Sequence, residues 1–226
     1  RLEQGVWEYR ECGDLHGVYY DFALQIDGET RITTDVYARA CGINGKRSMA
    51  VDLRRTDPEG WEEDEAPDAG PEQVIYEIHV KEFSWAPAGG FPEEVRGKYR
   101  AFCCKDTTLY GDGVHPTGLS WLKELGITHV QLMPVYDYGS VDEAGDPMQF
   151  NWGYDPMNWN VPEGSYSSDP ARGEIRIREL KEAVQSLHRQ GFRVIMDVVY
   201  NHTYSLDTAM QKTVPWYYYR VKEDGT

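Results

Sequence analysis

The spacing of hydrophobic and polar residues differs between the first 56 residues and the rest of the chain. Over residues 18–26, apolar side chains alternate with polar ones, which is the period of a strand with one buried face. The residues on the apolar face are Tyr20, Phe22, Leu24 and Ile26. Asp27-Gly28 then favours a tight hairpin turn, and residues 31–36 are predicted to be the return strand. Residues 1–56 are therefore expected to be all-β, the end of a small β-sandwich whose earlier strands are missing.

A stretch rich in proline and glycine follows at residues 57–72. Its turn-forming residues are Pro58, Gly60, Pro67, Gly70 and Pro71. It also carries an acidic run at residues 62–65. This composition predicts a linker, and the acidic run indicates that the linker is a solvated connector.

From residue 73 onward, predicted strands alternate with predicted helices. The apolar runs that predict strands are residues 74–80, 127–133 and 194–199. Apolar residues at helical spacing predict two helices. The first is short, covers residues 119–125 and ends at Gly126, and the second covers residues 177–187 and stops near Gly191. Residues 135–173 are predicted to be irregular. This alternation implies a parallel sheet, and three strands are too few to close a barrel.

Composition excludes some classes of partner. The net charge of −15 at neutral pH argues against a nucleic-acid partner, which would require a basic patch, and against an anionic membrane surface. No apolar run is long enough to predict a transmembrane helix. The opening, Arg1-Leu2-Glu3, contains no initiator methionine and no apolar signal segment. The four cysteines form no Cys-x-x-Cys pair, which disfavours a zinc site, and they favour a cytoplasmic location.

Polar residues at the third predicted strand are candidates for chemistry. Asp197 interrupts the apolar run, while Asn201 and His202 follow just beyond it. A carboxylate inside such a run requires a partner, so Asp197 is expected either to face a buried cation or to have a purely structural role. His202 could bind a ligand or be a histidine satisfied within the core. Polar groups at the C-terminal ends of parallel barrel strands form active sites.

The loop at residues 151–156 is the second candidate. It reads Asn-Trp-Gly-Tyr-Asp-Pro, so glycine and proline punctuate it. Trp152 and Tyr154 could lie flat against the apolar face of a sugar ring, or they could pack within the loop. Asp155 could contact a substrate or cap the loop. His79 and His129 are expected in the barrel interior with hydrogen-bond partners.

These motifs resemble those of type I pullulanases, debranching enzymes of the alpha-amylase superfamily of glycoside hydrolases. The loop matches their Tyr-Asn-Trp-Gly-Tyr-Asp-Pro motif except that Phe150 replaces the first tyrosine. The stretch Asp-Val-Val-Tyr-Asn-His at residues 197–202 resembles the first conserved region of the superfamily. Further agreement at residues 76–80, 132–140 and 13–47 extends the resemblance to essentially the whole chain.

The resemblance implies a division of the chain into three parts. Residues 1–56 would be the C-terminal part of a β-sandwich similar to carbohydrate-binding modules. Residues 57–72 would be the linker. Residues 73–226 would be the N-terminal part of an amylase-type (β/α)8 barrel, containing strands one to three only.

The resemblance also implies roles for the site residues. Tyr154 would stack on the sugar before the scissile bond, and His202 would hydrogen-bond the same sugar. Trp152 and Asp155 are further substrate-binding candidates. Asp197 would orient an arginine beside the nucleophile. Asn201 would match an asparagine that binds calcium in many amylases but often only braces the loop in debranching enzymes. No residue is assigned to a metal and no cofactor is expected, although calcium remains open for the full-length enzyme.

The activity implied is cleavage of α-1,6 branch linkages in pullulan, glycogen or limit dextrins, with retention. The catalytic carboxylates of such enzymes follow later strands, so they are expected beyond Thr226 and the chain alone is expected to be an inactive fragment. Two alternatives stay open. One is a stand-alone, non-catalytic α-glucan-binding protein, and the other is a sister debranching or branching activity.

Overall fold

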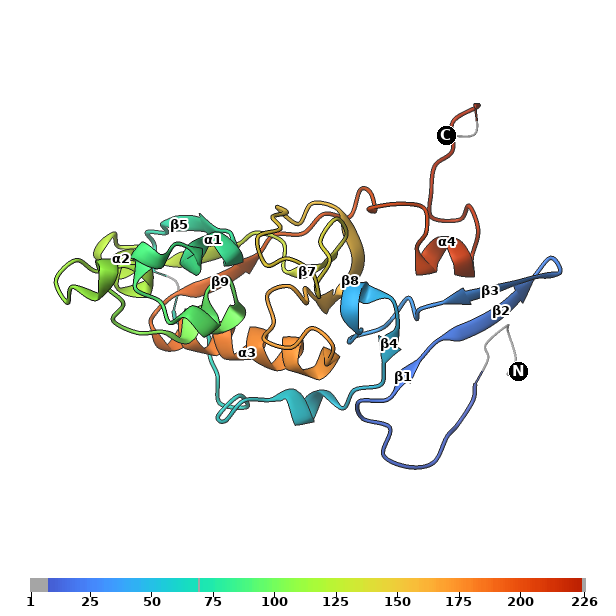
Figure 1. Cartoon of the computed structure of the whole chain (residues 1–226), viewed down its shortest axis with the longest axis horizontal. Helices are drawn as coiled ribbons and strands as arrows, with labels where there is room; N and C mark the ends of the chain where they lie inside the picture. Colours follow the sequence, from blue (N-terminus) through green and yellow to red (C-terminus); the bar gives the residue numbers. More distant parts are fainter. Residues whose placement is uncertain (1–7, 69, 225–226) are drawn as a thin grey trace.

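The structure is a computed structural model that describes residues 8–68 and 70–224. The expectations drawn from the two ends, Arg1 to Glu3 and Thr226, lie outside the described residues. At its centre is a three-stranded parallel sheet in the order β5-β6-β9 (Figure 1). Its strands are β5 (Ile75–Ile78), β6 (His129–Leu132) and β9 (Arg193–Met196). This arrangement confirms the predicted alternation of parallel strands and helices.

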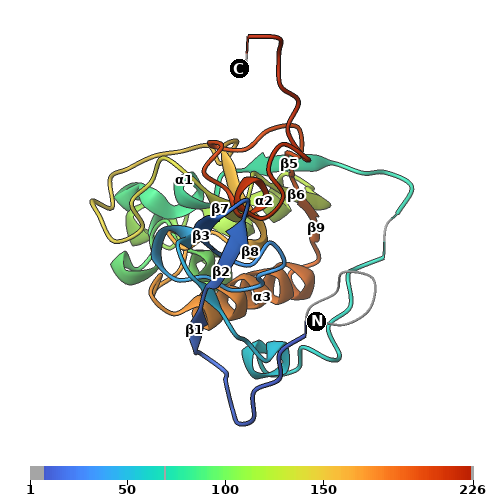
Figure 2. The same cartoon turned by 90° about the vertical axis from the view of Figure 1, so that its right-hand side faces the viewer.

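The described residues contain four α-helices. They are α1 (Val80–Trp85), α2 (Gly118–Glu124), α3 (Gly173–Arg189) and α4 (Ala209–Thr213). Short 3-10 turns fill the connections: η2 (Ile43–Gly45), η3 (Leu53–Thr56), η4 (Pro87–Gly89), η5 (Glu93–Val95), η6 (Tyr99–Cys103) and η7 (Leu109–Gly111). The long helix α3 lies along one side of the sheet and packs against η6 and β9 (Figure 2). Within the described ranges, no helix has the length and apolar character that crossing a membrane requires.

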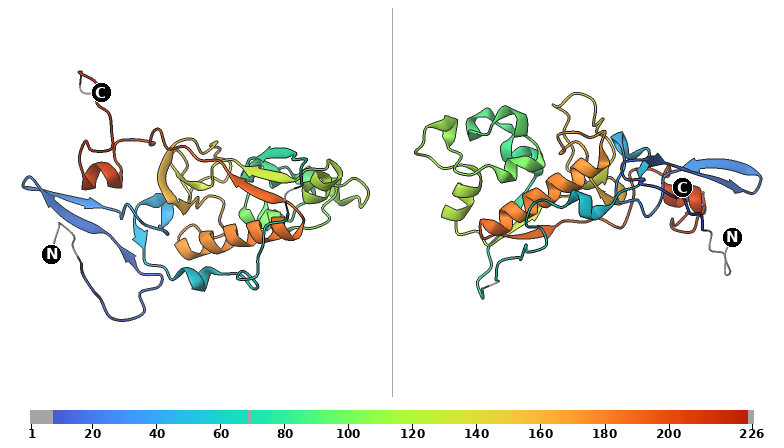
Figure 3. Two further views of the ribbon diagram at one scale, coloured as in Figure 1. Left: turned by 180° about the vertical axis from the view of Figure 1, so that it is seen from behind. Right: turned by 90° about the horizontal axis from the view of Figure 1, so that it is seen from below.

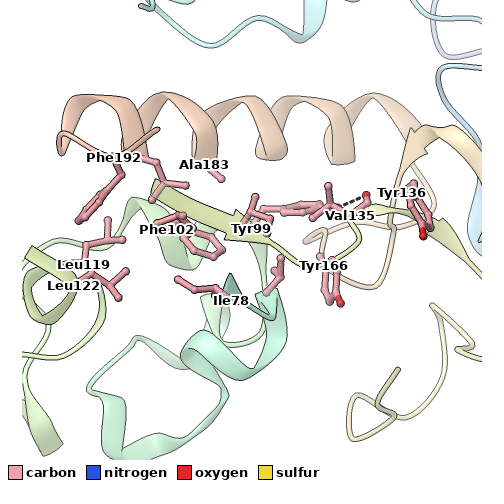
Figure 4. Packing of buried hydrophobic residues seen from close by; sticks show 14 of the residues in the cluster. Ile78, Tyr99, Phe102, Leu119, Leu122, Val135, Tyr136, Tyr166, Ala183 and Phe192 are labelled. Atoms are coloured by element: carbon pink, nitrogen blue, oxygen red, sulfur yellow. Dashed lines mark hydrogen bonds between the residues drawn. The ribbon is translucent and has the colours of Figure 1, made fainter. Parts of the chain in front are cut away.

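The main hydrophobic core lies between α3, the sheet and the turns that follow α1 (Figure 4). Aromatic residues supply much of it, since Tyr99, Phe102 and Phe192 are almost completely buried. The phenol of Tyr99 donates a hydrogen bond of 3.2 Å to the carbonyl oxygen of Val135, which satisfies its one polar atom inside the core. This core therefore ties the connection after β5 to the segment that follows β6.

The third strand is shorter and less buried than predicted. It ends at Met196 rather than Val199, and its residues are half-buried or exposed. The physical reason is its position, because β9 pairs with β6 on one side and has no second neighbour among the described strands. Asp197 thus lies one residue beyond the strand, where its amide still donates to the carbonyl of Leu132 at 3.0 Å.

The segment at residues 135–173 is not irregular throughout, which corrects the prediction. It contains an antiparallel pair, β7 (Tyr136–Tyr138) and β8 (Pro156–Pro162), with register shifts between all three pairs. The prolines at both ends of β8 and the asparagines within it conceal the strand, since such residues are typical of turns. The pair holds residues 139–155 as a loop anchored at both ends.

The N-terminal region forms two small antiparallel ladders. One joins β1 (Tyr19–Tyr20) to β4 (Ser48–Met49), and the other joins β2 (Phe22–Ile26) to β3 (Glu29–Thr33). The predicted turn is confirmed, since Asp27 and Gly28 both have positive φ, as a type I′ hairpin requires. The β2–β3 hairpin projects from the body of the molecule (Figures 1 and 3). These ladders do not pack face to face as two sheets, so the β-sandwich stays a prediction.

The segment that follows the ladders contacts α3 at several points, although Glu62, Glu63 and Glu65 of its acidic run are exposed. Asp57 forms an ion pair with Lys181 of α3, and the Asp64 carboxylate lies 2.7 Å from Nδ1 of His188. Gln185 donates a hydrogen bond of 3.2 Å to the carbonyl of Glu59. These side chains lie one turn apart along α3, which offers a polar row to the passing chain. Residues 57–64 are therefore bound along the helix.

Candidate functional site

The structure brings the two predicted motifs together at the C-terminal end of β9. The phenol of Tyr154, from the loop before β8, donates a hydrogen bond of 2.8 Å to Oδ2 of Asp197. Asp197 was expected to face a buried cation or a structural partner. Its partner in the structure is a neutral hydroxyl group. The bond spans 43 residues of sequence and links the loop to the strand end.

His202 contacts the same loop from the other motif. Its Nε2 lies 2.6 Å from the carbonyl oxygen of Tyr154, so this nitrogen carries the proton and donates. Its Nδ1 lies 2.9 Å from Oδ1 of Asn201. Tyr154 is thus held twice, by Asp197 through its side chain and by His202 through its backbone. Asn201 thus lies against its chain neighbour His202, and the roles expected for it stay predictions.

The loop itself is organised by Asn151. Its amide nitrogen donates to the carbonyl of Gly139 and to Oδ1 of Asp155, both at 2.8 Å. Its amide oxygen accepts the backbone N–H of Gly153, also at 2.8 Å. Asp155 in addition accepts the amide of Gly139 through its carbonyl at 2.9 Å. In this structure Asp155 therefore braces the loop, and its expected contact with a substrate stays a prediction.

Gly153 has a conformation that only glycine adopts without strain. Its φ is 89°, and a Cβ built there would lie 2.9 Å from Cβ of Pro134 and 3.0 Å from the Pro134 carbonyl. The loop thus approaches the end of β6 closely at this point. The residues on either side of Gly153, Trp152 and Tyr154, differ in exposure. Trp152 is 61% exposed, whereas Tyr154 is half-buried against Asp197.

Partial burial raises the pKa of Tyr154 to about 12, and its hydrogen bond to Asp197 contributes to the same shift. The phenol therefore stays protonated at neutral pH and keeps its role as donor. Its ring is fixed at the hydroxyl end, which leaves the ring face as the part that a ligand could cover. A fixed aromatic face with polar groups nearby suits a sugar, whose ring has apolar faces and a polar rim.

A groove of about 830 Å³ adjoins this cluster. Its lining includes Trp159, Tyr200, Asn201, His202, Tyr218, Tyr219 and Arg220. The indole of Trp159 donates to the carbonyl of Val199 at 2.5 Å, and its ring lies 6.0 Å from that of Tyr200. Sequence reasoning missed both Trp159 and Tyr200. Tyr200 lies inside the recognised motif at residues 197–202, and Trp159 lies three residues beyond the motif at residues 151–156.

Buried acidic residues form the one group among the described residues whose oxygens could surround a metal ion. Carboxylate oxygens of Asp137, Glu143 and Glu163 lie within 4.8 Å of one another. The guanidinium of Arg176, which is completely buried, lies 2.9 Å from Glu143 and 3.5 Å from Asp137. A cation thus already sits among these acids, and it comes from the protein itself.

Burial raises the pKa of Asp137 to about 7 and that of Glu163 to about 8. The guanidinium of Arg176 opposes the rise at Asp137, while the charge of Glu143 adds to it at both groups. Sequence analysis did not detect this cluster, because its members come from separate segments and share no spacing.

Comparisons with known proteins agree on one group. A protein-family model described as "Alpha amylase, catalytic domain" matches residues 105–221. The pullulanase of Bacillus subtilis (strain 168) is 41% identical over 228 residues, covering 100% of this chain and 31% of that protein. "Pullulanase 1, chloroplastic" of Arabidopsis thaliana is 33% identical and covers 98% of this chain and 27% of that protein.

Solved structures give the same result. The apo pullulanase of Paenibacillus barengoltzii matches with a TM-score of 0.93 at 44% identity, covering 100% of this chain and 35% of that one. A structure of the same enzyme in complex with maltohexaose and alpha-cyclodextrin matches with a TM-score of 0.88 at 45% identity. The match covers 94% of this chain and 33% of that one. The chain therefore spans about a third of the length of the relatives it matches.

Proposed function

Because this chain belongs to the alpha-amylase family of glycoside hydrolases and is similar to pullulanases along its whole length, we propose that it forms the first, substrate-contacting part of an α-1,6 debranching enzyme. The substrate class would be α-glucans such as pullulan, glycogen or limit dextrins, cleaved with retention. The observation that carries this proposal is the joint fixing of Tyr154 by Asp197 and His202. Relatives solved with maltohexaose, maltotetraose and maltotriose support the substrate class.

In this proposal, each site residue has a separate role in binding one glucose ring. Tyr154 supplies the flat aromatic surface, and Asp197 fixes the orientation of the Tyr154 ring by accepting a hydrogen bond from its hydroxyl group. His202 holds the backbone of the loop by its hydrogen bond to the Tyr154 carbonyl. Its exposed imidazole also lines the groove. Trp152 offers a second, more exposed surface to the chain of sugars. Precise placement of a substrate by such contacts lowers the entropy cost of reaction.

Retaining hydrolysis also needs a nucleophile and an acid/base about 5–5.5 Å apart. We assign neither role to a described residue, since the carboxylates nearest the site, Asp155 and Asp197, are both engaged in bracing the loop. This chain would therefore contribute binding and orientation, and the bond-breaking groups would come from later strands of the barrel.

The N-terminal ladders fit the same proposal. We propose that β1 to β4 belong to a β-sandwich of the carbohydrate-binding type that precedes the barrel. The support is the period-two pattern, the tight β2–β3 hairpin and the similarity of this region to pullulanases. A cytoplasmic location, and the expected lack of a nucleic-acid or membrane partner, stay predictions.

The test is a titration of the purified chain with maltotriose, in which the change in tryptophan fluorescence measures binding. We expect Tyr154→Ala to weaken binding about tenfold, or ~1.4 kcal/mol, because the ring surface is lost. Tyr154→Phe, the matched control, keeps the ring but loses the hydrogen bond to Asp197, so its loss should be only a few-fold. Wild-type affinity in Tyr154→Ala would exclude the stacking role.

A second measurement separates the enzyme from the binding-protein alternative. Release of reducing sugar from pullulan by the complete gene product is expected, and Tyr154→Ala in that product should lower the rate. Binding of maltotriose without any release of reducing sugar would favour a non-catalytic glucan-binding protein instead.

A further inference from the structure

A buried histidine, His79, contacts the loop at residues 139–155, called the sugar-contacting loop below. It is not among the residues assigned to the candidate site. His79 follows the last residue of β5 and is only 8% exposed. It was expected to lie within the strand. It instead forms the N-cap of α1, where its Nδ1 accepts the backbone N–H of Glu82 at 3.3 Å. An accepting nitrogen carries no proton, so this contact places the ring proton on Nε2.

The second ring nitrogen faces the loop. Nε2 of His79 lies 2.8 Å from the carbonyl oxygen of Asn151, which can only accept a hydrogen bond. The phenol oxygen of Tyr166 lies 3.1 Å from the same nitrogen, and the ring of Phe150 packs at 4.7 Å from the imidazole. Both contacts thus agree on one tautomer, neutral with the proton on Nε2.

The electrostatic surroundings support the neutral form. Burial lowers the pKa of His79, and the charge of Lys81 acts in the same direction. The hydrogen bond to Asn151 and the charge of Glu82 oppose this shift, but burial is the larger effect. Tyr166, the remaining titratable group in contact, offers a neutral hydroxyl.

Asn151 is the residue through which His79 can act at a distance. Its side chain makes the hydrogen bonds to Gly139, Gly153 and Asp155 that close the loop. A displacement of its backbone would therefore move the loop on which Tyr154 is held. Two hydrogen-bonded steps thus lead from α1 to the loop that carries Tyr154, the first from His79 to Asn151 and the second from the Asn151 side chain to the loop.

We propose that His79 is a positioning residue for the sugar-contacting loop: its imidazole caps α1 through Nδ1 and holds the Asn151 carbonyl through Nε2–H. The part of this proposal that concerns sugar rests on the proposed function. The part that concerns the order of the loop does not.

Two substitutions separate the two contacts. His79→Asn keeps an acceptor at the position of Nδ1, so α1 remains capped, but its amide is too short to reach Asn151. His79→Gln places an amide N–H about as far out as Nε2, so the loop contact is restored while the cap is weakened. Hydrogen exchange of two backbone amides reports the outcome: Glu82 for the cap and Gly153 for the loop.

In His79→Asn we expect the Gly153 amide to exchange at least tenfold faster than in the wild type, with Glu82 unchanged. In His79→Gln we expect the Glu82 amide to exchange faster than in the wild type, with the Gly153 amide unchanged. Equal protection of Gly153 in the wild type and His79→Asn would overturn the proposal, as would loss of both protections together in His79→Asn, since that pattern indicates a merely structural role.

A measurement on the unaltered chain covers the case in which a variant fails to fold. Nitrogen-15 NMR of histidine-labelled protein should show His79 neutral, with the proton on Nε2. The opposite tautomer would contradict both contacts and so refute the proposal.

Maltotriose binding then distinguishes this inference from the proposed function. Weaker binding in His79→Asn, restored in His79→Gln, supports both. If the wild type fails to bind maltotriose, the proposed function fails, while the exchange and NMR results still decide the role of His79.

Discussion

Single residues largely fix the geometry of the loop at residues 139–155. The loop has no helix or strand between β7 and β8, and its shape depends on the side chain of Asn151 and the backbone of Gly153. A loop of this kind is ordered only as long as each of its few hydrogen bonds is present. Substitutions within it should therefore act strongly and locally.

The first prediction at this scale concerns Gly153. Gly153→Ala adds a Cβ that would contact Pro134 at 2.9 Å, in addition to the strain of a positive φ. We expect a loss of about 1–3 kcal/mol in the free energy of unfolding, measured by urea denaturation, and weaker maltotriose binding. Gly126→Ala is the matched control, because Gly126 also has positive φ but has nothing within 4 Å of its added Cβ. It should be less destabilising, and equal effects would show that contact with Pro134 does not matter.

The candidate site illustrates what sequence can and cannot show about single residues. Tyr154, Asp197 and His202 were recognised from their motifs, and the structure places all three together. The partner of Asp197 was not recognised, since a hydrogen bond across 43 residues leaves no periodic signal. His79 was expected in a strand because apolar residues surround it. The hydrogen bonds that His79 accepts, from Glu82 through Nδ1 and from Phe83 through its carbonyl, show that a helix begins there.

At the scale of elements, the strongly periodic ones were predicted and the irregular ones were not. The pattern over residues 177–187 identifies α3, whose Ala183 and Leu187 are completely buried in the core. The pair β7–β8 escaped prediction because prolines bound β8. The cluster around Arg176 escaped for a different reason, since it joins α3 to β7 and to two loops. Which charged residues come together in the interior depends on how the elements pack against one another, and a single sequence does not reveal that packing.

That cluster predicts a pH dependence of stability. The pKa values of Asp137 and Glu163 are raised to about 7 and about 8, so the folded protein holds more protons than the unfolded chain between the ordinary carboxyl range and about pH 8. Stability should therefore fall as pH rises through this window. Melting temperatures measured from pH 5 to pH 9 should decrease, and Glu163→Gln should show a smaller decrease because it cannot ionise.

The control for that experiment is Glu124→Gln, which removes the same charge from an exposed position on α2. It corrects for the change in net charge and should leave the slope close to that of the wild type. A slope in Glu163→Gln as steep as in the wild type would mean that Glu163 takes up no extra proton on folding.

At the scale of the whole molecule, the sheet has two open sides. Neither β5 nor β9 pairs with a second neighbour among the described strands, and Ile75 and Met196 on them are 53% and 51% exposed. Unpaired strand edges with apolar side chains promote association between molecules. The sequence alone already indicated this, since three strands cannot close a barrel.

We therefore predict that the isolated chain associates as its concentration rises, as measured by sedimentation velocity. Met196→Lys should reduce association, because a charge on the edge opposes pairing. Leu125→Lys is the matched control, since Leu125 is 47% exposed but lies beyond the end of α2, outside the sheet. A chain that stays monomeric at every concentration, with a cooperative melt, would refute this prediction.

The binding of residues 57–64 along α3 also has a consequence for how the protein is made. The hydrogen bonds from Gln185 to Glu59 and from His188 to Asp64 join residues 126 and 124 positions apart. A ribosome that adds about 5–20 residues per second must work for several seconds between the two ends of these bonds. During that interval the acidic stretch has no helix to lie against. The N-terminal hairpin can form at once from local contacts, whereas residues 57–64 can be bound only after α3 has been made.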